Sequence, residues 1–281
     1  MAKTFSSMTE RDEKDVLVVD ALNLAFRWKH SGATQFVDQY ADTVLSLANS
    51  YKCGKIILAN DFGSSTYRKS IYPEYKGNRD ELRAKQTPEE AEAFKAFFTE
   101  FERAVANLEE KYGIPMFKYK GVEADDIAAY LVRRREAFGI NKIWLISSDA
   151  DWDLLVSENV SRFSYVTRKE IRLDNWSEKY DVSPEEFISL KCLTGDKGDN
   201  VPGIAQVGPK RAKSLIDQFG SAMDIYDAIP LSGSYVYVKN LNENAEQIML
   251  NYQLMDLVSF CEEAVGPENV ADIERRMMNA N

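Results

Sequence analysis

Four short apolar runs, separated by helical patterns, constrain the fold of this chain more than any other feature. Parallel strands that are covered on both faces show such near-continuous apolar runs. The segments between them keep apolar residues on one helical face, and the longest such helix is expected to begin near Pro88. The regular alternation of strand and helix predicts an α/β fold with a parallel sheet. The four runs are Val16–Val19, Lys55–Ala59, Ile114–Phe117 and Lys142–Ile146.

The pattern changes after about Asp153. A short edge hairpin is expected first, followed by helices and loops with no strands forming a core of their own. We therefore expect a flexible tail at 1–15, an α/β core at 16–180 and a mostly helical portion at 181–281. The hairpin strands are predicted at Arg162–Thr167 and Glu170–Leu173, and the helices at Glu185–Leu193, Pro209–Phe219 and Glu243–Val258.

The rare residue types exclude several classes of chemistry. The 281 residues include one histidine, His30, and three widely spaced cysteines. A Ser-His triad and the usual His or Cys zinc site are thereby disfavoured, whereas carboxylate chemistry with hard cations is not. Unpaired cysteines fit reduced thiols in a cytoplasmic protein. The longest apolar run, Ile127–Val132, is too short to span a bilayer, and the polar tail is no signal peptide, so no membrane partner is expected.

Carboxylates follow the predicted strands at the points where they end. Because the carboxyl ends of parallel strands meet at one edge of a sheet, seven of these side chains should lie together. A single one is ordinarily a turn or helix-start residue, but seven repel one another unless cations hold them. Oxygen-only ligands favour Mg²⁺ or Mn²⁺, and two such ions roughly 3.5–4 Å apart would support phosphodiester hydrolysis. The seven are Asp20, Asp61, Glu123, Asp125, Asp126, Asp149 and Asp151, and Asp196 and Asp199 follow further along the chain.

Two other folds with carboxylate sites fail at the first strand. A haloacid-dehalogenase-type phosphatase needs D-x-D there, and this chain has Asp20-Ala21-Leu22. A topoisomerase–primase-type domain would place Glu at that point. Neither alternative fits.

Five motifs, in order, make the chain resemble the 5′-nuclease or flap endonuclease family. They are V-V-D-A-L-N (18–23), Y-K-G-N-R (75–79), G-V-E-A-D-D (121–126), S-S-D-A-D-W-D (147–153) and G-D-K-G-D-N-V-P-G-I (195–204). The short form without a fused polymerase is most similar to the stand-alone enzymes of tailed phages. The resemblance implies a PIN-like core, a helical arch at about 70–112 and a helix-hairpin-helix (helix–three-turn–helix) element at about 195–220.

The resemblance also implies an activity and its cofactors. Two Mg²⁺ ions, for which Mn²⁺ could substitute, would serve the hydrolysis of DNA at 5′ flaps and at single-stranded or duplex 5′ ends, and also of RNA–DNA hybrids during primer removal. Asp20, Asp61, Glu123, Asp125 and Asp126 match the first metal site, with Asp126 acting through water. Asp149, Asp151, Asp196 and Asp199 match the second.

The net charge of the chain is −10, but one segment of it is locally basic. Between 67 and 85 the chain has six basic and three acidic residues. Lys76, Arg79 and Arg83 are spaced to share one helical face, and Tyr75, with Tyr72, could stack on unpaired bases. The resemblance makes Lys76 and Arg79 candidates for contacting the scissile phosphate, and Arg27 a further candidate for DNA.

The segment from Pro202 to Ala212 resembles the hairpin element that binds duplex phosphates. Its amides and the following helix N-terminus would face the duplex, with charge from Lys210 and Arg211. The family usually has glycine where this chain has Gln206. This difference could change the local backbone shape and the binding of a K⁺ ion at the hairpin.

Two other functions stay open from the residues. A PIN-like metal-dependent ribonuclease is disfavoured by the hairpin element and by the chain length. A binding module without catalysis would lack carboxylates, and all nine are present. We expect a monomer located in the cytoplasm, which is the host cytoplasm if a phage encodes it.

Overall fold

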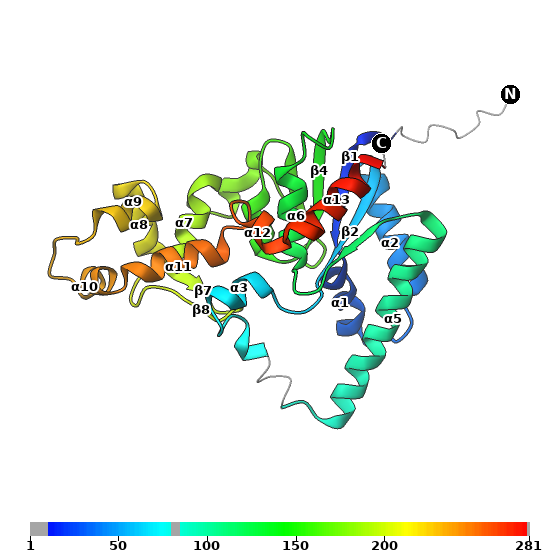
Figure 1. The fold of residues 1–281 in the computed structure, drawn as a ribbon, viewed down its shortest axis with the longest axis horizontal. Coiled ribbons are helices and arrows are strands. Elements are labelled where there is room, and N and C mark those ends of the chain that lie inside the picture. Colours follow the sequence, from blue (N-terminus) through cyan, green and yellow to red (C-terminus); the bar gives the residue numbers. More distant parts are fainter. Residues whose placement is uncertain (1–10, 80–84, 280–281) are drawn as a thin grey trace.

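The computed structural model describes residues 11–79 and 85–279 and contains a six-stranded sheet (Figure 1). The strand order is β3-β2-β1-β4-β5-β6; β6 runs antiparallel to β5, and all other pairs are parallel. The predicted parallel α/β core is confirmed. The strands are β1 (Asp12–Asp20), β2 (Cys53–Asn60), β3 (Met116–Lys118), β4 (Lys142–Ile146), β5 (Val160–Ser164) and β6 (Lys169–Ile171).

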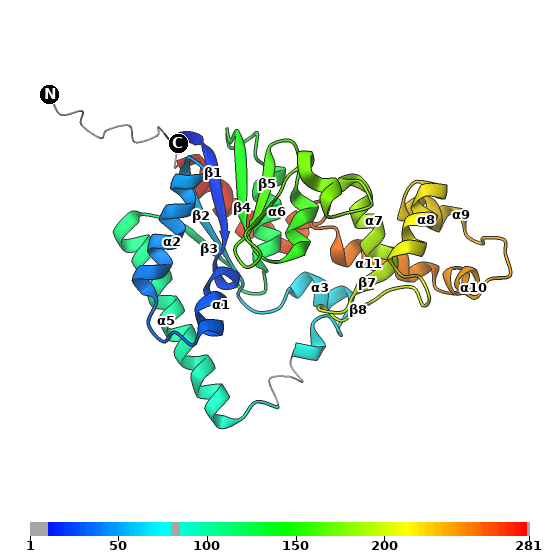
Figure 2. The ribbon, with the colours of Figure 1, turned by 180° about the vertical axis from the view of Figure 1, so that it is seen from behind.

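Helices cover both faces of this sheet (Figures 1 and 2). One apolar cluster joins a sheet face to α1 (Ala21–Ser31), α2 (Val37–Ser50) and α5 (Pro88–Tyr112). A second cluster joins the other face to α6 (Ala124–Arg133), α12 (Cys261–Val265) and α13 (Pro267–Asn279). Both faces of β1 are therefore buried, which explains its uninterrupted apolar run.

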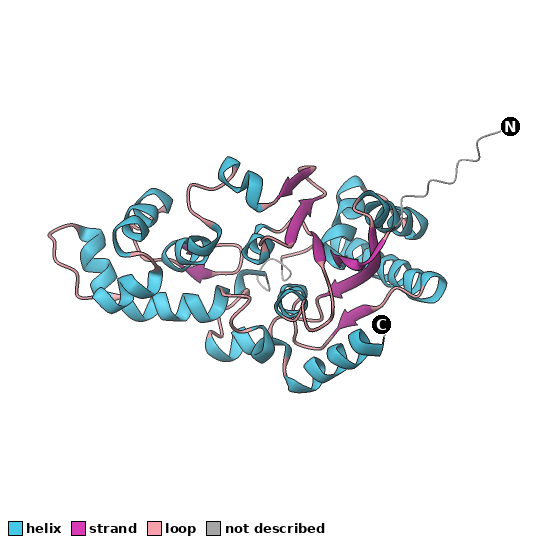
Figure 3. Cartoon of the chain, turned by 90° about the horizontal axis from the view of Figure 1, so that it is seen from above, coloured by secondary structure: helices cyan, strands magenta, loops and turns pink. Residues whose placement is uncertain are grey.

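The helical portion has its own apolar cluster and lies to one side of the sheet (Figures 1 and 3). It contains α7 (Pro184–Thr194), α8 (Pro209–Phe219), α9 (Ala222–Ala228), α10 (Val236–Glu243) and α11 (Ala245–Met255). The chain then returns, because α12 and α13 pack in the cluster of the α/β core. The portion predicted at 181–281 is mostly helical, as expected, and its last two helices pack on the α/β core.

Several predicted boundaries were wrong in detail. Strand β1 begins at Asp12, so residues 12–15 belong to the sheet rather than to a tail. The helix predicted at Glu243–Val258 is α11, which runs from Ala245 to Met255, and the preceding α10 was not predicted. The helical portion also contains a small antiparallel pair, β7 (Gly195–Asp196) and β8 (Val201–Pro202). The predicted hairpin is confirmed as β5 and β6.

The described parts of the predicted arch are two limbs that leave the sheet separately (Figures 1 and 2). Helix α3 (Thr66–Ile71) leads one limb, and α5 is the other. Thr87 forms a capping box with Glu90, Pro88 is the first helical residue, and Gly113 ends α5 in the left-handed conformation. These signals explain why the predicted helix start is correct.

Two further 3₁₀ helices complete the fold, η1 (Ala150–Leu155) and η2 (Leu173–Glu178). No helix within residues 11–79 and 85–279 has the length and apolar character that a membrane crossing requires.

Candidate metal centre

Three carboxylates stand at or just beyond the carboxyl ends of adjacent strands. Asp20 ends β1 and accepts hydrogen bonds from Asn23 N–H (3.2 Å) and the Ser147 hydroxyl (2.8 Å). Asp61 follows β2 and accepts from the Ala124 N–H at 2.6 Å. Asp149 follows β4 and caps η1. The neighbouring order of these strands gathers the three side chains at one edge.

Helix α6 delivers the next group from its amino-terminal turn. Glu123 is the residue before the helix, and Asp125 and Asp126 lie in its first turn. Asp125 accepts a hydrogen bond from the Trp152 indole N–H at 2.5 Å. The bond of Asp61 to Ala124 ties the start of α6 to the end of β2, which brings this group to the strand-end carboxylates.

The last two carboxylates come from the β7–β8 pair, where Asp196 ends β7 and Asp199 lies in the loop that follows. Asp196 Oδ1 accepts hydrogen bonds from the N–H groups of Gly198 and Asp199. The loop closes tightly, because a Cβ on Gly203 would stand 2.2 Å from the carbonyl carbon of Thr194. Only glycine allows the two backbone segments to approach in this way.

Lysine 76 lies between two of these groups. Its ammonium is 2.9 Å from Glu123 Oε1 and 3.5 Å from Asp199 Oδ2. Arg79 adds a contact of 2.8 Å to Asp199 Oδ1. The Lys76 N–H also donates to the Asp199 carbonyl, so the base of the arch is fastened to the β7–β8 loop.

A second lysine bridges the other carboxylates. Lys191, on α7, is 2.5 Å from Asp151 Oδ1 and 2.9 Å from Asp196 Oδ2. Lys191 is 9% exposed. The two acidic side chains outweigh its burial and raise the pKa of Lys191, so it is charged.

Burial and mutual repulsion raise the pKa of several carboxyls. Burial, and then the charge of Asp61, hold the pKa of Asp20 well above its usual range. Burial, and then the charge of Asp149, do the same for Asp125. Burial raises the pKa of Asp151 to about 6, although Lys191 opposes the shift. Glu123 behaves differently, because Lys76 and Arg68 outweigh its burial and lower its pKa.

The donor set fits divalent cations. Within residues 11–79 and 85–279, no Lys or Arg forms an ion pair with Asp20, Asp61, Asp125 or Asp149. Their oxygens are hard ligands of the kind that Mg²⁺ and similar cations prefer. Within these described residues, the side chains do not place three or more Asp, Glu, His or Cys groups in positions that could hold a metal ion.

Asp126 is engaged by the protein itself. Arg68 approaches it with two nitrogens at 2.7 and 2.9 Å, and Arg68 also donates to the Leu254 carbonyl. Both side chains are buried. Arg68, Lys191 and Trp152 were not singled out from the sequence. Trp152 and Lys191 have only proximity to acidic motifs as a sequence signal, since Trp152 lies inside S-S-D-A-D-W-D and Lys191 lies five residues before Asp196; Arg68 lies in the basic segment.

Two expectations for the arch were wrong. Tyr75 is 3% exposed, and its hydroxyl donates to Glu123 and Asp199, so it is not available to stack on a base. Lys76 has a φ of 56° and lies in a turn, so it does not share a helical face with Arg79. Arg83 lies outside the described residues. Arg27 is exposed and donates to the Tyr165 hydroxyl at 2.8 Å.

The backbone at Gln206 adopts a conformation that favours glycine. That residue has a φ of 64°, in the left-handed region where glycine is favoured. Lys210, in the first turn of α8, is exposed. Arg211 donates to the Gln206 carbonyl and stands over the Tyr237 ring at 4.5 Å, so it also fastens α10 to the hairpin.

Comparison with known proteins decides the family. Residues 15–181 match the model of the 5′-3′ exonuclease N-terminal resolvase-like domain, and 182–278 match the 5′-3′ exonuclease C-terminal SAM fold. The chain belongs to the 5′-3′ exonuclease family. This confirms the resemblance seen in its motifs.

The relatives include both short and long proteins. The flap endonuclease of Escherichia phage T5 is 40% identical over 95% of this chain and 93% of its own length. The DNA polymerase I of Rhizobium leguminosarum is 38% identical, but the match spans 57% of this chain and only 14% of that protein.

A solved structure agrees with this chain along almost its whole length. A variant of the phage T5 flap endonuclease, in a pseudo-enzyme-product complex with DNA and metal ions, gives a TM-score of 0.88 at 39% identity. The match covers 94% of this chain and 98% of that one. The present protein is thus a 5′-nuclease, and the family is metal-dependent.

Proposed function

We propose that this protein cleaves DNA at 5′ flaps and 5′ ends by metal-assisted phosphodiester hydrolysis. The observation that carries the proposal is the set of Asp20, Asp61, Asp125 and Asp149, which have no cationic partner among the described residues, beside Lys76 at the base of the arch. The cleavage of flaps and RNA primers in replication is the corresponding biological role.

We assign the carboxylates to two ions. Asp20, Asp61, Glu123 and Asp125 would hold the first, and Asp126, gripped by Arg68, would act on it through water. Asp149, Asp151, Asp196 and Asp199 would hold the second. Mg²⁺ is the ion we assign, with Mn²⁺ as a substitute, because both accept all-oxygen ligands. When bound, such ions lower the pKa of water and neutralise charge on phosphate oxygens.

The arch residues would bind the phosphate that is cut. Lys76 stands between carboxylates of both groups, at 2.9 Å from Glu123 and 3.5 Å from Asp199. A fixed ammonium there stabilises the negative charge that grows on a phosphate as its bond breaks. Arg79, which contacts Asp199, would hold a neighbouring phosphate oxygen, and its half-exposed side chain is open to DNA.

The hairpin would bind the duplex on which a flap is carried. Lys210 is exposed beside the amino end of α8, where unpaired N–H groups favour phosphate. Arg211 adds charge nearby, and the positive φ of Gln206 is compatible with a K⁺ ion at the hairpin carbonyls. Arg27 and Arg83 complete the expected DNA contacts, with Arg83 outside the described residues. We further propose a monomer acting in the host cytoplasm.

The alternative is a ribonuclease built on the same sheet, and one assay separates the two. Matched 5′-flap substrates with DNA or RNA flaps are incubated with Mg²⁺, with Mn²⁺ and with EDTA. We expect cleavage of the DNA flap near its junction in either metal and none in EDTA. Cleavage restricted to RNA would support the alternative, and binding without cleavage in either metal would support a binding module.

A further inference from the structure

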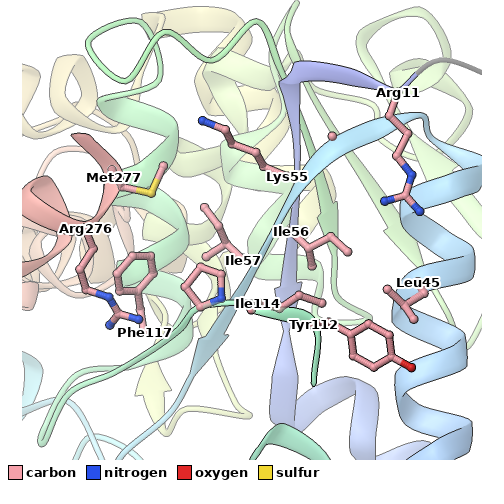
Figure 4. A pocket seen from close by; sticks show the side chains of 13 residues that line it. Arg11, Leu45, Lys55, Ile56, Ile57, Tyr112, Ile114, Phe117, Arg276 and Met277 are labelled. Carbon is pink, nitrogen blue, oxygen red and sulfur yellow. The ribbon is translucent and has the colours of Figure 1, made fainter. Parts of the chain in front are cut away.

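A cavity of about 480 Å³ lies against strand β2 at the end opposite to the carboxylates (Figure 4). Apolar side chains from β2 and from the segment before β3 line it, including Ile56, Ile57 and Ile114. Helix α13 forms another wall through Met277. Nothing in the nuclease mechanism uses this cavity.

The cavity adjoins a part of the β2 edge that does not pair with β3. Within the described residues, β3 pairs only with Leu58, Ala59 and Asn60 of β2. The Leu58 N–H donates to the Pro115 carbonyl, so even-numbered residues of β2 direct their backbone groups toward this edge. The N–H and C=O of Ile56 therefore point toward the cavity. An uncovered stretch of strand edge is a template for another strand.

The charged residues around the cavity all have the same sign. They are Arg11, Lys55 and Arg276, and no acidic residue is among the thirteen that line it. Figure 4 shows Arg11 on one side of β2 and Arg276 on the other. Arg276 stands over the Phe117 ring at 4.3 Å and has its acidic neighbour, Asp272, at 3.7 Å. In a chain with net charge −10, such a lining is a local exception that favours an acidic ligand.

We propose that this cavity binds an extended, acidic segment of a partner protein, which adds a strand beside Ile56. Backbone hydrogen bonds to the edge would set its register, alternate apolar side chains would enter the cavity, and its carboxylates would meet Lys55 and Arg276. An extended chain alternates its side chains between two faces, so the carboxylates lie together on one face and the apolar side chains on the other.

The position of the cavity suits a partner that acts together with the nuclease. The carboxylates lie at the other end of β2, and the hairpin before α8 lies at the far end of the molecule (Figures 1 and 2). A segment docked on the β2 edge would leave both surfaces open to DNA. This proposal goes beyond the nuclease activity and does not depend on it.

A labelled peptide tests the proposal on the full chain. Fluorescence anisotropy is recorded with a fluorescein-labelled peptide of sequence Asp-Val-Asp-Ile-Asp-Phe-Asp. We expect saturable binding that weakens at least tenfold in Lys55→Glu/Arg276→Glu. The matched control, Arg103→Glu/Lys239→Glu, reverses two exposed charges elsewhere and should bind as the wild type does. Both variants should cut a short 5′ flap at the wild-type rate.

Three variations of the probe separate strand addition from general stickiness. N-methylation of alternate peptide amides should abolish binding, because the ladder would lose its donors. Replacing Asp by Lys should do the same. Equal binding of the methylated or the basic peptide would overturn the proposal, as would no binding at millimolar peptide. Stronger binding after deletion of residues 1–10 would identify that segment as the occupant and would also overturn it.

Discussion

The ammonium of Lys76 lies 2.9 Å from Glu123 Oε1, which places a cation of the arch against a carboxylate that begins α6. The same ammonium reaches Asp199 at 3.5 Å, so one side chain joins both groups of acids. Lys76 is 7% exposed. Positive charge in such a shielded place acts strongly on a bound phosphate.

Replacing Lys76 should therefore slow the chemical step more than it weakens DNA binding. For Lys76→Ala we expect a loss of about two orders of magnitude in single-turnover cleavage, comparable with the loss of one transition-state donor. Binding of a 5′ flap in Ca²⁺ should change little. Lys197→Ala, at an exposed lysine of the β7–β8 loop, is the control and should cleave normally. If the single-turnover rate of Lys76→Ala recovered fully at saturating enzyme, Lys76 would contribute only to DNA affinity and not to the chemical step.

Lys191 should stabilise the metal-free protein by holding Asp151 and Asp196 together. Lys191→Met leaves two carboxylates facing each other without a cation, and breaking such a buried pair costs about 3–5 kcal/mol. We expect a lower melting temperature in EDTA and partial recovery in saturating Mg²⁺, because the ion supplies the missing charge. A melting temperature unchanged in EDTA would mean that the bridge contributes nothing to stability.

The raised pKa of Asp125 predicts that this carboxyl destabilises the metal-free fold at neutral pH. Its folded pKa lies above its unfolded value, so the folded state binds more protons, and stability falls as the pH rises from about 4 toward the folded pKa. Asp125→Asn should therefore raise the melting temperature in EDTA at pH 8 by about 2–4 °C. The gain should vanish at pH 4. If Asp125→Asn were less stable than the wild type at pH 8, the ionised Asp125 carboxylate would not be destabilising the fold.

Asp126 should contribute more to stability than to ion binding. Arg68→Met leaves a fully buried carboxylate unpaired, which should cost about 3–5 kcal/mol in urea unfolding. Arg68→Met/Asp126→Leu should recover part of that loss, since neither buried charge remains. If the double variant were no more stable than Arg68→Met, the pair would not be the source of the cost.

The sequence predicted elements whose local signals agree with their packing. The limits of β4 and α8 were predicted without error, and the start of α5 follows from Thr87 and Pro88. The parallel direction of β1, β2 and β4 follows from apolar runs alternating with helices. Since seven of the nine carboxylates follow a predicted strand or begin a predicted helix, the sequence also predicted the edge at which those seven meet.

What the sequence could not predict depends on contacts between distant segments. Tyr75 lies in a basic segment, where an exposed aromatic side chain was expected. It is buried instead, because its hydroxyl donates hydrogen bonds to Glu123 and Asp199. Arg68 lies in a basic segment typical of DNA binding, yet it is buried against Asp126 and Leu254. The return of α13 to the core has no local signal, because its partners lie more than one hundred residues earlier.

The central claim is that the carboxylate edge performs the cleavage with divalent ions, and Asp125→Asn tests it most directly. Single-turnover cleavage of one 5′-flap DNA is measured at saturating Mg²⁺, and flap binding is measured in Ca²⁺ on the same preparation. The account predicts that cleavage falls below detection while flap binding stays near that of the wild type. Cleavage near the wild-type rate, with binding intact, would contradict it.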